Sequence, residues 1–175
     1  MIRYFFTFAL ILLAALSRLV PHPVNVAPIT ALALFGGVYL DKKHTFVVPI
    51  AAMLVADYFI GFYSGMFWVY GAFALIGLLG LWLRDHRSVG NTVGASLAGS
   101  VIFFAVSNFG TWISGQVGYP LNVAGLIECY TAAIPFFRNT LAGDMAYVAA
   151  LFGLYELAAR VLPSLAKPQR AADAI

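Results

Sequence analysis

Long apolar stretches, separated by short polar or charged turns, fill most of this chain. They cover residues 4–20, 26–40, 45–61, 67–83, 92–113 and about 132–162. A helix needs about 20 apolar residues to cross the hydrocarbon layer of a bilayer, and most of these stretches approach that length. The pattern therefore predicts an all-α integral membrane protein, a bundle of about six transmembrane helices.

Two of the stretches depart from a simple span. The stretch 26–40 is short, so we expect it to be tilted or to have ordered loop at one end. Pro21 and Pro23 precede it, and each proline removes an N–H donor and restricts the residue before it. Residues 21–25 are therefore predicted to form a structured loop folded back onto the bundle. The last stretch is expected to include an interfacial piece broken near Pro135.

The basic residues predict an orientation. With the N-terminus inside, only Arg18 and Arg138 fall on the outer side, and the other eight fall on the inner side: Arg3, Lys42, Lys43, Arg84, Arg87, Arg160, Lys167 and Arg170. Such a bias predicts that the inner side is cytoplasmic. We expect a protein of the bacterial inner membrane with both termini in the cytoplasm and with outward loops around 21–26, 62–66 and 113–131.

The domain organisation follows from the same spans. Residues 1–162 are predicted to form a single transmembrane domain, followed by a polar cytoplasmic tail over 163–175. A cleaved signal peptide over 1–17 is the alternative, since small residues at Ala15 and Ser17 follow an apolar core. An uncleaved first helix keeps the charge distribution consistent.

Composition agrees with the membrane assignment and excludes several classes of protein. The chain is 62% hydrophobic and 10% charged, with a mean hydropathy of +0.90, whereas soluble domains carry roughly 25% charged residues. The net charge of +3 comes from scattered basic residues, so no nucleic-acid partner is expected. No hydrolase, zinc-protease or phosphate-loop motif is present. We therefore predict no catalytic residues and no intrinsic cofactor.

Small residues spaced four apart recur in the apolar stretches. The pairs are Ala27/Ala31, Ala52/Ala56, Ala95/Gly99 and Ala142/Ala146. Such pairs let helices approach closely. They indicate either packing within the bundle or a docking surface for a partner membrane subunit.

Four ionisable residues lie within the predicted spans: Arg18, Asp57, Arg138 and Asp144. Such groups are costly in a membrane and usually face an interior cavity. The topology brings two basic and two acidic groups together toward the outer side. They are predicted to form two buried salt bridges, to line a pocket open to the outside, or to do both.

Polar and aromatic residues accompany these charges in the outward loops and helix ends. They are His22, Asn25, Asn108, Trp112, Gln116, Tyr119, Asn122, Glu128, Cys129, Tyr130 and Asn139. A few converging polar groups among apolar walls are typical of a small-molecule pocket. Trp112 and Tyr119 can equally be interfacial anchors.

Cys129 is the single cysteine of the chain, which excludes an intramolecular disulfide and a multi-cysteine metal site. A lone cysteine is most often inert packing. As a thiolate it would be a soft ligand for a transition metal, including one carried by a cofactor. The neighbouring Glu128 disfavours the thiolate because its charge has the same sign.

Several motifs resemble a known family. They are the segment 18–37, RLVPHPVNVAPITALALFGG, the span that contains Asp57, and the segments 107–110, 128–130 and 135–144. Over nearly the whole chain to about Arg160, these residues resemble an uncharacterised bacterial family of putative transport proteins similar to S components of energy-coupling factor transporters.

The resemblance implies a function and its partners. It implies a six-helix subunit that captures a vitamin or similar micronutrient from the outside and docks onto a membrane coupling subunit with ATPases. A solitary protein of the S-component-like group binds cobalamin through a cysteine thiolate on the cobalt. Cobalamin is therefore the most concrete ligand, with Cys129 as the candidate metal ligand.

Two other classes of function stay open from the sequence. One is a structural or assembly subunit of a larger membrane complex, in which the charged residues only hold helices together. The other is a thiol-dependent enzyme that acts on the captured cofactor through Cys129. Enzymatic activity is not expected from the motifs.

Overall fold

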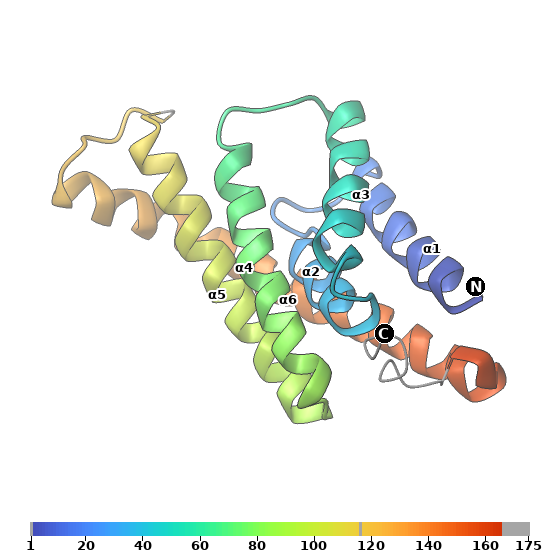
Figure 1. Ribbon diagram of the computed structural model, residues 1–175. Coiled ribbons are helices and arrows are strands. Elements are labelled where there is room, and N and C mark those ends of the chain that lie inside the picture. The colour runs from blue at the N-terminus through green and yellow to red at the C-terminus, as the bar shows by residue number, and fades with distance from the viewer. Residues whose placement is uncertain (1, 116, 166–175) are drawn as a thin grey trace.

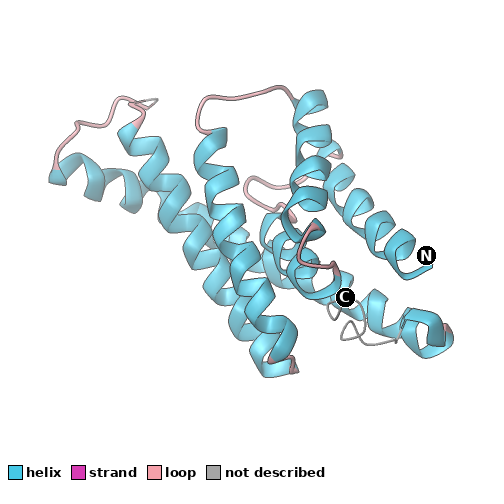
Figure 2. Ribbon diagram, in the orientation of Figure 1, coloured by secondary structure: helices cyan, strands magenta, loops and turns pink. Residues whose placement is uncertain are grey.

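A computed structural model describes residues 2–115 and 117–165, and every regular element in this part of the chain is helical (Figures 1 and 2). The α-helices are α1 Ile2–Leu16, α2 Ile29–Tyr39, α3 His44–Ile60, α4 Met66–Asp85, α5 Val89–Ile113 and α6 Val123–Val161. Two short 3-10 helices, η1 Ser17–Leu19 and η2 Pro163–Leu165, follow α1 and α6. The all-α prediction is confirmed for the described residues.

Four helical segments are long and apolar enough to cross a membrane. They are Ile2–Leu19, which joins α1 to η1, and the helices α4, α5 and α6. The helix α2 and the apolar part of α3, Val47–Ile60, are shorter. Length and hydropathy thus agree with a multi-pass membrane protein, with four segments of spanning length among the described residues.

The helices alternate in direction, so the connections gather at two ends of the bundle (Figure 1). We call the end with the start of α1, the turns 41–43 and 86–88, and η2 the turn end. The opposite end, with residues 20–28, 61–65 and 114–122, is called the loop end. The predicted tail begins on the bundle, because Leu165 is buried and its carbonyl accepts a hydrogen bond from Tyr155 Oη at 3.2 Å. Residues 166–175 of that tail lie outside the described residues.

Helix α2 forms the centre of the bundle. All eleven of its residues are buried, and the other five α-helices contact it. Gly37 of α2 and Gly80 of α4 lie so close that a Cβ atom on either would meet the other helix's backbone. An apolar helix without a polar face is expected in such a position.

The loop before α2 folds back onto the bundle, as predicted. The side-chain Nδ2 of Asn139 in α6 donates a hydrogen bond to the carbonyl of Val24 at 3.0 Å. Val26 packs against Gly143, where a larger residue would crowd it. Ordered loop thus covers the N-terminal end of the short helix α2.

Arg84 completes the other end of α2. Its guanidinium donates hydrogen bonds to the carbonyl of Gly37 at 2.6 and 2.9 Å and to the carbonyl of Leu40 at 2.5 Å. The last carbonyls of a helix lack partners within it and carry partial negative charge. Arg84 was assigned above only to the orientation of the protein, and in the structure it also caps the central helix.

The prediction for the last helix was wrong in two respects. α6 begins at Val123, so the predicted outward loop 113–131 is limited to 114–122, and α6 continues through Pro135 without a break. The side-chain oxygen of Asn122 accepts a hydrogen bond from the N–H of Gly125 at 3.0 Å, which starts the helix early. Pro135 removes one backbone hydrogen bond, but its ring is exposed on the surface of α6 and the helix continues past it.

The small-residue pairs were predicted correctly in part. Ala31, the pair Ala52/Ala56 and the pair Ala95/Gly99 are buried between helices, and Ala27 packs against the core. Ala142 and Ala146 are exposed on α6 instead. Packing within the bundle is therefore not the role of this pair, and Gly143, one position along the helix, makes the close contact with Val26 instead.

Candidate functional site

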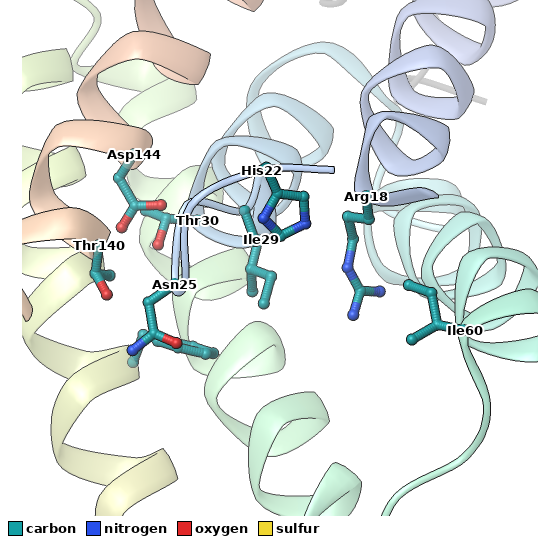
Figure 3. A pocket seen from close by; sticks show the side chains of 10 residues that line it. Arg18, His22, Asn25, Ile29, Thr30, Ile60, Thr140 and Asp144 are labelled. Carbon is teal, nitrogen blue, oxygen red and sulfur yellow. The ribbon is translucent and has the colours of Figure 1, made fainter. Parts of the chain in front are cut away.

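A cavity of about 260 Å³ lies toward the loop end of the bundle (Figure 3). It brings together residues from η1, the loop before α2, α2 itself, α3, α5 and α6. The lining residues are Arg18, His22, Asn25, Ala27, Ile29, Thr30, Ile60, Phe103, Thr140 and Asp144. Polar groups thus converge on a concave site with apolar walls, the arrangement expected of a small-molecule site.

The loop before α2 supplies the polar residues His22 and Asn25. Asn25 has a φ of 63°, a left-handed conformation that asparagine tolerates better than most residues. His22 is exposed, and its Nδ1 lies 3.0 Å from the carbonyl oxygen of Pro23. In Figure 3 both side chains lie between those of Arg18 and Asp144.

Arg18 on one side of the cavity forms a buried ion pair. Its Nη1 lies 2.7 Å from Oδ1 of Asp57, whose side chain is 0% exposed. The hydroxyl of Tyr70 donates a hydrogen bond to the other oxygen of Asp57 at 2.7 Å. This is one of the two predicted salt bridges, and it joins η1 to α3 and α4.

Asp144 on the other side of the cavity is 2% exposed and has no such partner. The hydroxyl of Ser100 donates a hydrogen bond to its Oδ2 at 2.6 Å, and the backbone N–H of Thr30 also interacts with the carboxyl. Thr30 lies in the first turn of α2, where a helix carries partial positive charge. No lysine, arginine or histidine of the described residues forms an ion pair with Asp144.

Two threonine hydroxyls lie beside this carboxyl. The Oγ1 of Thr30 is buried next to Asp144 but has no hydrogen bond of acceptable geometry. Thr140 Oγ1 donates one long hydrogen bond, 3.4 Å, to the carbonyl of Phe136. A buried hydroxyl without a partner is uncommon. The carboxylate and the two hydroxyls together offer several acceptors to a donor that enters the cavity.

The predicted site residues separate into two groups. Arg18, His22, Asn25 and Asp144 line the cavity, Asp57 holds Arg18, and Asn139 holds the loop. A second group lies between α5 and the start of α6 and its loop, outside this cavity: Asn108, Trp112, Cys129 and Tyr130. The structure therefore does not bring Cys129 to the cavity that holds the charges.

The second group makes contacts that hold helices together. Cys129 is 3% exposed, and its thiol lies 3.5 Å from the carbonyl oxygen of Asn108. The hydroxyl of Tyr130 donates to the carbonyl of Ala105 at 2.5 Å, and Trp112 Nε1 donates to the carbonyl of Pro120 at 2.9 Å. Gln116, also proposed for the site, lies outside the described residues.

The prediction that Arg138 joins the buried charges was wrong. Arg138 is exposed and forms no ion pair with the described residues. With 39 residues, α6 is about 58 Å long, nearly twice the ~30 Å hydrocarbon layer, so it must be inclined or extend beyond that layer. A long basic side chain on its first half can reach the polar interface.

Sequence reasoning missed four polar residues of the site and its supports, Thr30, Ser100, Thr140 and Tyr70, as well as the apolar lining residues Ile29, Ile60 and Phe103. The first three are hydroxyl residues inside apolar stretches, which is a signal that could have been used. Tyr70 gave no such signal, because tyrosine is common in membrane helices. The described residues contain no group of three His, Cys, Asp or Glu that could hold a metal ion.

Comparisons with known proteins assign the chain to a family, but the function of that family is unknown. Neither the curated proteins nor the solved structures contain a match to it. One family model matches residues 1–165, which is nearly all of the chain. The protein therefore belongs to DUF6580, a family of unknown function.

Proposed function

We propose that this protein is a small-molecule-binding subunit of an uptake system in the bacterial inner membrane, similar to an S component. The cavity near the loop end supports the proposal, since the positive-inside orientation predicts that this end faces outward. A ligand would then be captured from the outer side. No element for nucleotide hydrolysis was predicted from the sequence, so transport would depend on a gradient or on a partner with ATPases.

The single observation that carries the proposal is that the buried carboxylate of Asp144 has no cationic partner among the described residues. A buried carboxylate is costly unless a cation or several hydrogen bonds balance it. Here Ser100 and the start of α2 provide donors, but no side-chain cation does. A ligand with an ammonium group would supply the missing charge. Its N–H groups would donate to Asp144, Thr30 and Thr140.

The size of the cavity limits the ligand. Its 260 Å³ lies just below the range of about 300–1,000 Å³ of typical ligand pockets. A compact amine fits this volume better than a corrin ring does. Cobalamin is therefore the less favoured ligand, and Cys129, which would have to ligate its cobalt, is buried elsewhere.

The experiment begins with the protein purified from cells in mild detergent. Mass spectrometry of the denatured sample identifies any small molecule that copurifies. A thermal-shift panel then adds small amines such as pyridoxamine and ethanolamine, with cobalamin as a separate arm. A ligand at 100 times its Kd stabilises the folded state by about 2.7 kcal/mol, which the panel detects readily.

Two variants make this experiment decisive. Asp144→Asn keeps the shape of the side chain and should abolish the shift, whereas Arg138→Gln, a charge change on the same helix outside the cavity, should leave it unchanged. A shift that survives in Asp144→Asn would move the binding site elsewhere. Protein with no copurified molecule and no shift with any compound would contradict the proposal.

Cobalamin has its own test. Protein purified from cells supplied with cobalamin should be colourless if the compact-amine assignment is right. A corrinoid absorption spectrum that changes in Cys129→Ala would instead establish thiolate ligation and would make cobalamin the ligand. Cys129→Ala also tests the hypothesis of a thiol-dependent enzyme, because such an enzyme would lose its activity without the thiol. The burial of the Cys129 thiol does not favour this hypothesis.

A structural or assembly subunit is the second candidate function. The ion pair of Arg18 and Asp57, with the hydroxyl of Tyr70, favours it, because these contacts hold helices whether or not a ligand is present. Such a subunit would gain no stability from any small molecule. It would instead copurify with a defined membrane partner at a fixed stoichiometry.

A further inference from the structure

A second cavity lies at the opposite end of the bundle from the ligand cavity. It measures about 520 Å³ and runs between the beginning of α5 and the C-terminal half of α6. We call it the α5–α6 groove. None of its lining residues belongs to the cavity that holds Asp144.

The α5–α6 groove is polar at its mouth and apolar along its length. Arg87, Ser88 and Arg160 lie at the turn end, and Val93, Met145 and Phe152 line the part that runs toward the middle of the bundle. The surrounding surface is apolar and exposed; for example, Val89 is 85% exposed. A site of this form suits an amphiphile whose charged group lies at the turn end.

The charges at the mouth favour an anionic group. Glu156 also lines the mouth, but it already forms an ion pair with Arg87 and accepts a hydrogen bond from Tyr39 Oη at 2.9 Å. Arg160 is exposed and forms no ion pair or hydrogen bond with the described residues. Two guanidinium groups thus face one carboxylate, which leaves one positive charge unbalanced, and the beginning of α5 adds partial positive charge.

We propose that the α5–α6 groove binds an anionic phospholipid. The phosphate binds the guanidinium of Arg160, next to the ion pair of Arg87 and Glu156, because a guanidinium matches phosphate oxygens with two parallel hydrogen bonds. One acyl chain follows Val93, Met145 and Phe152. The predicted orientation places this mouth at the cytoplasmic leaflet, where basic pockets between helices bind acidic headgroups.

The test measures lipid retention on the purified full chain by native mass spectrometry in detergent. Phosphatidylglycerol, phosphatidylcholine and glycerol 3-phosphate are added separately. Phosphatidylglycerol should be retained and phosphatidylcholine should not. Arg160→Gln should weaken retention of phosphatidylglycerol about fivefold, as expected for one basic residue at an anionic surface.

Arg138→Gln is the matched control, since it removes an exposed arginine from the same helix far from the groove. It should retain phosphatidylglycerol like the unmodified protein. Equal losses in Arg138→Gln and Arg160→Gln would mean general attraction between charges and would overturn the proposal. So would unchanged retention in Arg160→Gln, or binding of glycerol 3-phosphate as tight as that of the lipid. Thermal unfolding without added lipid confirms that both variants fold.

Discussion

Arg18 and Asp144 line one cavity from opposite sides (Figure 3), but the guanidinium of Arg18 forms its ion pair with Asp57, 2.7 Å away. The two carboxylates are buried to the same degree, at 0% and 2% exposed. Asp57 is paired with a cation, whereas Asp144 has no cationic partner among the described residues. The first carboxylate therefore holds helices together, and the second is the one that we propose to bind a ligand.

Asp57→Ala should destabilise the protein strongly. The substitution leaves the guanidinium of Arg18 without its partner and Tyr70 without an acceptor, and breaking a buried pair costs about 3–5 kcal/mol. Thermal unfolding in detergent would measure the loss. Arg138→Ala is the control and should change stability by less than about 0.5 kcal/mol, because Arg138 is exposed and unpaired among the described residues. Equal losses in the two variants would contradict this account.

Thr30→Val should leave the ligand-free protein as stable as before or make it slightly more stable. The Oγ1 of Thr30 is buried beside Asp144 without a hydrogen bond of acceptable geometry, so its removal should cost little and relieves a desolvated hydroxyl. Thr45→Val is the control with a bonded hydroxyl: Thr45 is equally buried, and its hydroxyl donates to the carbonyl of Asp41 at 2.9 Å and accepts from Arg84 Nη2 at 3.2 Å. That variant should lose about 1 kcal/mol. Ligand-induced stabilisation should fall only in Thr30→Val.

Arg84→Ala should destabilise the central helix. The carbonyls of Gly37 and Leu40 would lose charged donors, and each such hydrogen bond contributes about 1.5–3 kcal/mol. Arg84→Lys should recover only part of the loss, because an ammonium group cannot reproduce the fork of a guanidinium. Lys43→Ala, an exposed change at the same end, should have little effect on the unfolding temperature. Full recovery by lysine would show that charge alone matters at this position.

The turn 41–43 should add a small contribution to stability that is present at neutral pH and is lost in acid. Burial opposes the ionisation of Asp41, but hydrogen bonds from the backbone and the ring of His44 outweigh it and hold the pKa of Asp41 below its ordinary value. A lowered carboxyl pKa stabilises the folded state above the unfolded-state value of about 3.9. That stability is lost as the pH falls through the folded-state value.

The measurement compares unfolding temperatures of the unmodified protein and Asp41→Asn between pH 3 and 7. The difference should be greatest near neutral pH and should shrink as the medium becomes acidic. Because the pair is partly exposed, it should correspond to less than about 1 kcal/mol. A difference in unfolding temperature that grows toward low pH would contradict a lowered pKa of Asp41.

The thiol of Cys129 should be unreactive in the folded protein. It is 3% exposed between α5 and α6, and reactive cysteines are partly exposed. A maleimide reagent should label the protein only after unfolding in detergent and denaturant. Rapid labelling of the native protein would show that the start of α6 opens, which would revive a role for this thiol.

The hydrophobic pattern predicted the helices and their order well, because a chain this apolar can satisfy its backbone in a membrane only as helices or a closed barrel. It also predicted the folded loop before α2, since Pro21 and Pro23 exclude helix there. The pattern failed at the start of α6. The side chain of Asn122 caps the helix there, and a single capping asparagine does not change the hydropathy pattern.

The sequence predicted part of the site, because charged residues stand out within apolar stretches. Arg18 and Asp144 are conspicuous because charges are costly in a membrane, and both line the cavity. Sequence alone could not show that Arg18 pairs with Asp57 rather than Asp144, because this depends on how α3 and α6 are placed. Arg138 was assigned to the interior because hydropathy does not show which face of a helix is turned toward its neighbours, and Arg138 lies on an exposed face of α6.

The shortness of α2 also determines how far a ligand must travel. Eleven residues rise about 16 Å, roughly half of the ~30 Å hydrocarbon layer. In the proposed orientation the turn end lies at the membrane surface, and the first residues of α2, which line the cavity, would then lie near the middle of the bilayer. A bound molecule would therefore already have passed half of the permeation barrier, and only the packed half around Gly37 and Gly80 would have to open for its release.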